Sequence, residues 1–106
     1  MENVIASREF DIHNMDDQEI GIIQILIFKP EEDSEQGGDW VCQYKVVQPD
    51  QVKISKAYGV DSIQAFLNAI KKIESELLHF QKSHACKIRW LGLNTLGLST
   101  DLDIYK

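Results

Sequence analysis

The sequence predicts a single α+β domain in which an antiparallel meander sheet of four to five strands packs against one long amphipathic helix on one face. Three observations lead to this expectation. Residues 4–58 hold four runs that resemble strands, residues 61–82 hold one run with helical periodicity, and a short apolar segment follows the helix. A chain of 106 residues without an internal repeat or a linker is expected to form one domain, residues 1–106.

The first two expected strands differ in which of their faces are apolar. In the run 4–13, Phe10 and Ile12 alternate with charged side chains, which is typical of a half-buried strand. The run 20–28 reads IGIIQILIF and is apolar on both faces. We therefore expect it at the centre of the sheet, with its second face covered by another layer or by another subunit.

The next segments are expected to complete the sheet. The acidic stretch 30–39 is expected to be a loop, and a further strand is expected at 40–47. Pro49-Asp50 marks a turn. The run 52–58 that follows is short and more polar, and its two lysines suit a strand at the edge of the sheet.

The helix is expected to begin at Asp61, because Asp61 is a good N-cap and Gln64 three residues later completes a capping-box pattern. Apolar residues then recur at helical spacing over about five turns. They are Ile63, Phe66, Leu67, Ile70, Ile73, Leu77 and Phe80. Residues 86–91 are expected to be a fifth strand or an extension beside the helix, and 91–98 to cover part of the core without regular structure.

The charge of the chain is negative and unevenly distributed. The net charge is −6, but residues 1–39 carry eleven acidic against two basic side chains, whereas residues 40–106 carry six against nine. A nucleic-acid binder needs basic side chains that contact phosphates, so the composition argues against that class. An acidic surface favours a basic partner or none.

The sequence favours a cytoplasmic protein that does not enter a membrane. Cys42 and Cys86 are too few for a disulfide scaffold, and both lie in apolar runs, so we expect two buried reduced thiols. The N-terminal MENVIASREF has no apolar segment of the kind found in signal peptides. No apolar run approaches the roughly 18 residues that a membrane helix needs.

The acidic stretch PEEDSEQGGDW is the strongest candidate for a functional site. Its glycines and acids match no register of an EF-hand calcium loop, and exposed carboxylates lack the cleft that catalytic pairs need. It is either a solvated connection or a contact surface for a basic partner, and its length, greater than the usual two to five residues of a hairpin loop, favours function. The candidate contact residues are Glu31, Glu32, Asp33, Glu35, Asp39 and the neighbouring Trp40.

A second acidic patch precedes the central strand and consists of Asp16, Asp17 and Glu19. In a meander, the two acidic loops can lie at opposite ends of the strands, in which case only one of them can dominate a compact interface. We choose the longer one, residues 30–39.

The sequence contains no pattern that indicates a metal, a cofactor or a catalytic group. His79, His84 and Cys86 form an H-x4-H-x-C run that matches no common zinc spacing, and His13 stands apart from them. There is no GxGxxG sequence and no phosphate loop. No serine or cysteine has the flanking glycines of a nucleophile elbow. We therefore expect no cofactor, no metal and no enzymatic activity.

Several short motifs resemble a family of small, uncharacterised bacterial proteins. They are WVCQY at 40–44, GVDSIQAFLNAI at 59–70, ASREF at 6–10, and the WLG and LGL elements at 90–92 and 96–98. The resemblance covers most of the chain and departs at Phe66, where that family has Leu, and at Ser99, where proline is common. It implies the fold described above but no catalytic residues.

A small acidic domain of this shape also resembles, as a class, the immunity proteins that neutralise secreted bacterial toxins, many of which are basic nucleases. The sequence therefore favours a non-catalytic protein that occludes the active site of a basic toxin nuclease. One alternative is a structural or regulatory homodimer joined through the second face of residues 20–28. The other alternative is a small-molecule enzyme without a recognisable motif.

Overall fold

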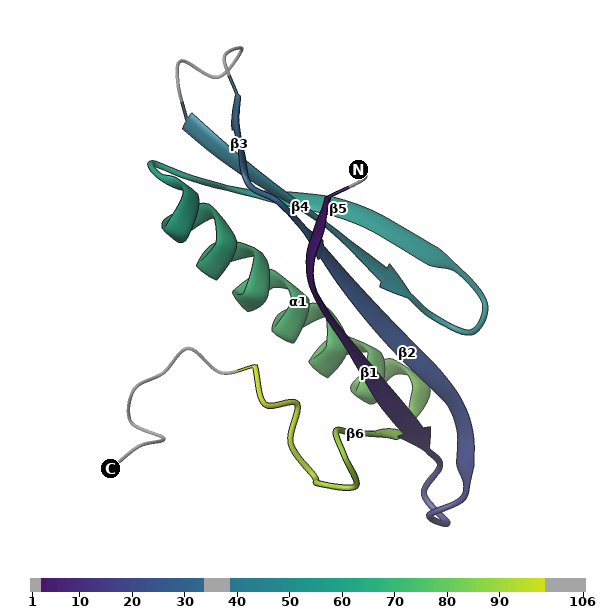
Figure 1. The fold of residues 1–106 in the computed structure, drawn as a ribbon. Coiled ribbons are helices and arrows are strands. Elements are labelled where there is room, and N and C mark those ends of the chain that lie inside the picture. The colour runs from purple at the N-terminus through teal and green to yellow at the C-terminus, as the bar shows by residue number, and fades with distance from the viewer. Residues whose placement is uncertain (1–2, 34–38, 99–106) are drawn as a thin grey trace, which may run out of the picture.

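The computed structural model describes residues 3–33 and 39–98 and confirms the α+β class, with one helix packed on an antiparallel sheet (Figure 1). The elements are β1 (Val4–His13), β2 (Glu19–Phe28), β3 (Glu31–Asp33), β4 (Asp39–Val47), β5 (Val52–Gly59), α1 (Ser62–His84) and β6 (Lys87–Arg89).

The order of the strands across the sheet confirms the predicted meander. β5 pairs with β4, β4 with β2, β2 with β1, and β6 returns after the helix to pair with β1, all in antiparallel orientation. β2 is therefore central and β5 lies at an edge, both as expected. The fifth strand expected at 86–91 is real but short, because Leu91 and Gly92 adopt positive φ angles of 52° and 78° that end it.

Residues 31–33 contradict the expectation of a loop at 30–39. They form β3, which pairs with the first residues of β4. The run Glu-Glu-Asp has little intrinsic preference for a strand, but the backbone groups of β4 offer hydrogen-bond partners to the returning chain. The hairpin is thereby lengthened beyond the end of the central sheet (Figure 1).

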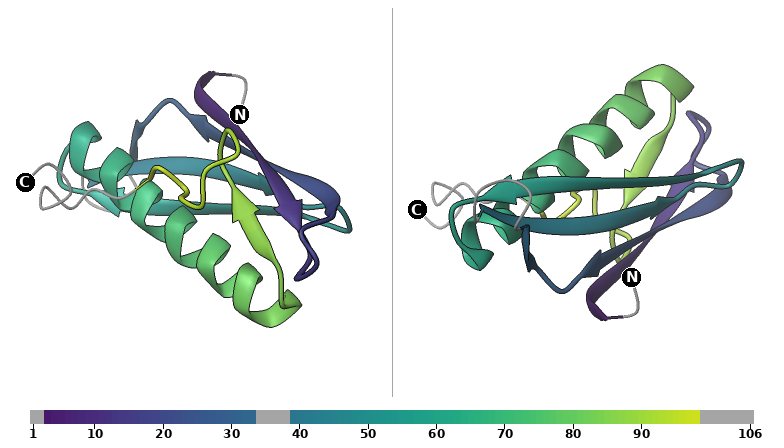
Figure 2. Two further views of the ribbon diagram at one scale, coloured as in Figure 1. Left: turned by 90° about the horizontal axis from the view of Figure 1, so that it is seen from below. Right: turned by 90° about the horizontal axis from the view of Figure 1, so that it is seen from above.

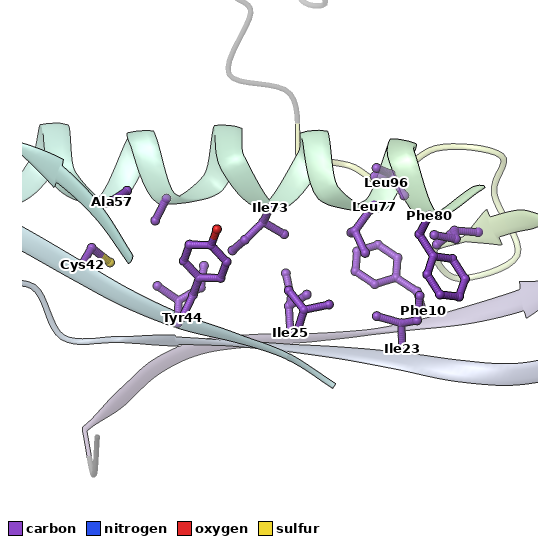
Figure 3. Close-up of a cluster of buried hydrophobic side chains, with 14 of the residues drawn as sticks. Phe10, Ile23, Ile25, Cys42, Tyr44, Ala57, Ile73, Leu77, Phe80 and Leu96 are labelled. Atoms are coloured by element: carbon purple, nitrogen blue, oxygen red, sulfur yellow. The ribbon is translucent and has the colours of Figure 1, made fainter. Parts of the chain in front are cut away.

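The core lies between α1 and one face of the sheet (Figure 3). Side chains of the helix meet those of the four long strands there, and Cys42, Tyr44, Val46, Ile23, Ile73 and Leu77 are all fully buried. Arg8 fastens the irregular segment 91–98 to β1, since its guanidinium donates to the carbonyl oxygens of Leu96 (2.9 Å) and Gly97 (2.8 Å) and stacks on Trp90 (3.8 Å).

The start of α1 confirms the predicted cap. The Asp61 carboxylate accepts a hydrogen bond from the Gln64 backbone N–H (2.7 Å), and the Gln64 side chain accepts one from the Val60 N–H (2.7 Å). One N–H of the first helical turn and the N–H that precedes the cap are thereby satisfied by side chains.

The buried stripe of α1 differs from the predicted one in its first half. Ala65 and Ala69 are fully buried there, whereas Ile63 is 69% and Leu67 is 40% exposed. The reason is the close approach of the helix to β5 at Gly59, where an added Cβ would lie 2.3 Å from the backbone nitrogen of Ala65. Only small residues fit between two backbones at that separation, so the larger apolar residues turn outward.

The second face of the sheet carries no described element, because α1 and residues 91–98 both lie on the core side (Figure 2). Several apolar side chains on it are therefore open to solvent: Ile22, Val52 and Ile54 are each about half exposed. Within residues 3–33 and 39–98, no helix is both long and apolar enough to cross a membrane.

Candidate functional site: an acidic hairpin beside an apolar depression

The two acidic loops lie at opposite ends of the sheet. The β3–β4 hairpin projects from one end, and the turn between β1 and β2 lies at the other (Figure 1). The longest dimension of the molecule is 49 Å. The two predicted contact patches, at the β3–β4 hairpin and at the β1–β2 turn, are therefore far apart. A single compact interface can contain only one of them.

The register of the β3–β4 hairpin sets the direction of its acidic side chains. Glu32 lies opposite Trp40, on the face of the sheet that the helix covers. Asp33 lies opposite Asp39 on the other face. Glu31, opposite Val41, shares that other face. Glu35, also predicted as a contact residue, lies outside the described residues.

The acidic side chains of the hairpin are open to contact. Glu31, Glu32 and Asp39 are exposed and Asp33 is half-buried. Within the part of the chain that the structure describes, neither Glu31 nor Glu32 forms an ion pair. No described basic side chain therefore neutralises their charge.

An apolar depression of about 470 Å³ lies at the base of this hairpin. Trp40, half-buried, forms one wall, and Phe66 and Ile63 of α1 form the other. Ile5, Pro30, Lys29 and Ser62 complete the lining. An apolar patch with a charged rim is the usual arrangement of a protein interface, and aromatic side chains such as Trp40 often anchor one.

The second acidic loop is partly neutralised by the fold. The Asp17 carboxylate accepts a hydrogen bond from Arg89 Nη2 (2.6 Å) and lies 3.8 Å from Lys87 Nζ. The hydrogen bond and the charge of Arg89 lower the pKa of Asp17 below its usual value. Asp16 and Glu19 remain exposed at this end.

One cluster of titratable side chains escaped the sequence analysis. Asp11, His13 and Glu19 each offer one ligand atom, and these atoms lie within 4.8 Å of one another. Asp11 and His13 are two residues apart on β1 and therefore share a face, and this spacing can be recognised in the sequence. Glu19 joins them because the register shifts between Ile12 and His13, so that His13 pairs with Glu19.

Neither cysteine has the environment of a nucleophile. Both thiols are buried and free, and burial raises the pKa of Cys42 to about 11. At pH 8 about one Cys42 thiol in a thousand is then ionised, against roughly one in four for an ordinary thiol.

We expect iodoacetamide to alkylate Cys42 of the folded protein more than about a hundredfold more slowly than it alkylates glutathione, because the thiolate is the reacting species.

Mass spectrometry of the alkylated peptides at pH 8 measures this rate for Cys42 and Cys86 separately. In urea both thiols should react at the rate of glutathione. Fast alkylation of Cys42 under native conditions contradicts its burial in the core.

A second pocket, of about 620 Å³, lies between α1 and residues 91–98. Glu74 lines it, and three further polar side chains there already make hydrogen bonds within the fold. Gln81 accepts from the Ile88 N–H (2.8 Å), Asn94 accepts from Arg89 (2.9 Å), and the Thr95 hydroxyl accepts from the Gly97 N–H (3.2 Å). These three engaged side chains position residues 87–98 on α1 and β6 and are not free to converge on a substrate.

Comparison with curated proteins and with solved structures finds no match. A family profile described as a domain of unknown function, DUF6968, matches residues 6–100. Because this match spans nearly the whole described domain, the chain belongs to the DUF6968 family.

Proposed function

We propose that the chain is a non-catalytic binding protein that meets a basic protein partner through the β3–β4 hairpin and the apolar depression at its base. In its most specific form, the proposal is that the partner is a secreted toxin nuclease and that the chain protects the cytoplasm by occluding its active site. The observation that carries it is the position of Glu32, which is exposed and lies opposite Trp40, on the face of the sheet that holds the apolar depression. Its neighbour Glu31 is exposed on the other face, and neither has an ion pair among the described residues.

The chemistry of a nuclease explains why these features fit it. A nuclease holds phosphate with basic side chains, so an acidic hairpin can occupy the same cleft. Clustered charge also raises the rate of association with an oppositely charged partner. A fast association suits an inhibitor that must block the toxin before it cleaves nucleic acid. The depression lined by Trp40, Ile63 and Phe66 supplies the apolar contact that long-range charge does not.

The test is a capture experiment in lysate of the cells that encode the chain, with the immobilised chain as bait. The matched bait carries Glu31→Lys and Glu32→Lys. The proposal predicts a basic protein on the first bait that is absent from the second, and predicts that one equivalent of the chain abolishes its nuclease activity. A captured protein that is not basic, or whose nuclease activity persists at saturating chain, contradicts the proposal.

A second candidate function is a homodimer with a structural or regulatory role, joined through the helix-free face of the sheet. The observation that favours it is the exposure of Ile22, Val52 and Ile54 on that face. The charges of this face allow two copies to pack against each other. Acidic side chains lie on β1 and lysines lie on β4 and β5, so β1 of one copy can lie over β5 of the other. These residues are Glu9, Asp11, Lys45 and Lys56.

The size of this face predicts a weak dimer. Four strands about 4.8 Å apart and about seven residues long cover on the order of 450 Å² per copy, which is at the lower end of specific interfaces. Light scattering over a dilution series should show twice the 12.2 kDa mass of the chain only at high concentration, and Ile54→Glu should abolish the increase. A monomer at every concentration rules the dimer out.

A further inference from the structure

We propose that Asp11, His13 and Glu19 form a binding site for one divalent transition-metal ion of the zinc class. Their ligand atoms lie within 4.8 Å of one another, which is close enough for small side-chain rotations to bring all three to one ion. The site is at the opposite end of the sheet from the β3–β4 hairpin and does not depend on the function proposed for that hairpin.

The β1–β2 hairpin holds the three side chains in place. Asp11 and His13 are two residues apart on β1 and therefore share a face, and Glu19 is the cross-strand partner of His13. The turn between them is closed by Asn14, whose side-chain oxygen accepts hydrogen bonds from the backbone N–H groups of Asp16 (2.9 Å) and Gln18 (3.0 Å). A metal would thus bind to a rigid frame, and little conformational entropy is lost on binding.

The contact of His13 with the turn leaves one ring nitrogen for a metal. Its Nδ1 lies 3.3 Å from the carbonyl oxygen of Asp17. In the tautomer with the proton on Nδ1, this nitrogen donates to the carbonyl and Nε2 presents a lone pair. Metal-bound histidines almost always donate their other N–H in this manner, which fixes the ring and raises its basicity.

The charges around the cluster favour a cation. Lys87 and Arg89 lie opposite His13 and Asp11 on β6, but both contact the carboxylate of Asp17. Three carboxylates therefore face two basic side chains at this end, and the carboxylates of Asp11 and Glu19 have no ion pair among the described residues. A bound divalent ion would match the two carboxylate charges of Asp11 and Glu19.

The ligand set selects the kind of metal. One imidazole and two carboxylates suit zinc and its neighbours, whereas magnesium and calcium prefer oxygen ligands alone and more of them. Three protein ligands leave at least one coordination position for water or for a ligand from another molecule.

The experiment is a titration of the full chain with zinc chloride, followed by isothermal calorimetry and by NMR of the histidine ring protons. We expect one zinc ion per chain and shifted signals for His13. Glu19→Gln and His13→Ala should each weaken binding by more than the roughly 10- to 100-fold that loss of an outer-shell contact costs. Glu19 is exposed, so its replacement leaves the fold intact, which circular dichroism checks.

The matched control is His79→Ala, which removes an exposed histidine of α1 far from the cluster in sequence and should leave binding unchanged. Absence of saturable binding overturns the proposal, as does equal binding by His13→Ala. Magnesium chloride at the same concentration should leave the His13 signals in place, and an equal response to magnesium contradicts the zinc-class assignment.

Discussion

Gly59→Ala is expected to destabilise the fold by about 3 kcal/mol or more, which is the upper range for overpacking in a core. The added Cβ would lie 2.3 Å from the nitrogen and 2.9 Å from the Cα of Ala65, and 2.7 Å from the carbonyl carbon of Gln64. These are backbone atoms of the first helical turn, so no side-chain rotation relieves the clash. The start of α1 must move away from β5, and the contacts of Ala65 and Ala69 are lost with it.

Thermal unfolding measures this effect. For a domain of about 100 residues, each kcal/mol lowers the midpoint by roughly 4–8 °C, so a decrease of more than about 12 °C is expected. Gly21→Ala is the matched control, because its Cβ meets only side-chain atoms, at 3.2 Å from Pro49 Cγ and 3.5 Å from Ile12 Cδ1. A Gly59→Ala variant as stable as Gly21→Ala would show that the helix does not approach β5 this closely.

Gly59 also shows where sequence reasoning about the fold succeeds and where it stops. The motif Gly59-Val60-Asp61 marks the start of the helix, and the cap at Asp61 could be predicted from residue types alone. That Gly59 touches the helix backbone could not, because the contact depends on how α1 lies across β5. For the same reason the hydrophobic period predicts a stripe that includes Ile63, although Ile63 is exposed.

The strands follow the same division. Alternation predicts β1 and β4, the continuous apolar run 20–28 predicts β2, and the short, more polar run 52–58 predicts β5 at the edge. β3 could not be predicted, since Glu31 and Glu32 favour a loop and only pairing with β4 orders them. The apolar second face of β2 was predicted to be covered by another layer or by another subunit. No described element of the chain covers it, and Ile22 is 48% exposed, which leaves the second of these alternatives as a prediction.

The candidate sites differ in how far the sequence alone identifies them. The acidic run 31–35 is visible as a charge cluster in the sequence, and a meander explains why Glu31, Glu32 and Asp33 lie far from Asp16 and Asp17. The depression beside the hairpin is lined by Ile5, Trp40 and Phe66, which come from three separate elements. No local sequence pattern therefore predicts the depression. The cluster of Asp11, His13 and Glu19 depends on a register shift in β1, which residue spacing does not reveal.

Replacing Glu31 and Glu32 by lysine is expected to slow association with the captured basic partner by about tenfold or more at low salt, because steering by clustered charge raises association rates by roughly 10- to 1,000-fold. The fold should be unaffected, since both side chains are exposed and without ion pairs among the described residues. Stopped-flow mixing at increasing sodium chloride measures the rate. The difference from the native chain should shrink towards 1 M salt, where charges act over only about 3 Å.

The matched control changes the net charge by the same amount at the other end of the molecule, with Asp16→Lys and Asp50→Lys, both at exposed positions. If the β3–β4 hairpin forms the interface, this control associates nearly as fast as the native chain, because a screened charge at that distance adds little to the local potential. Equal slowing by both variants would mean that only net charge matters, and slowing by the control alone would place the interface at the end of the sheet that holds Asp16 and Asp50. Dissociation rates test the apolar depression separately. Trp40→Ala should raise the dissociation rate with little effect on the association rate. The reason is that an apolar anchor forms its contacts after the encounter, whereas the exposed charges act before it.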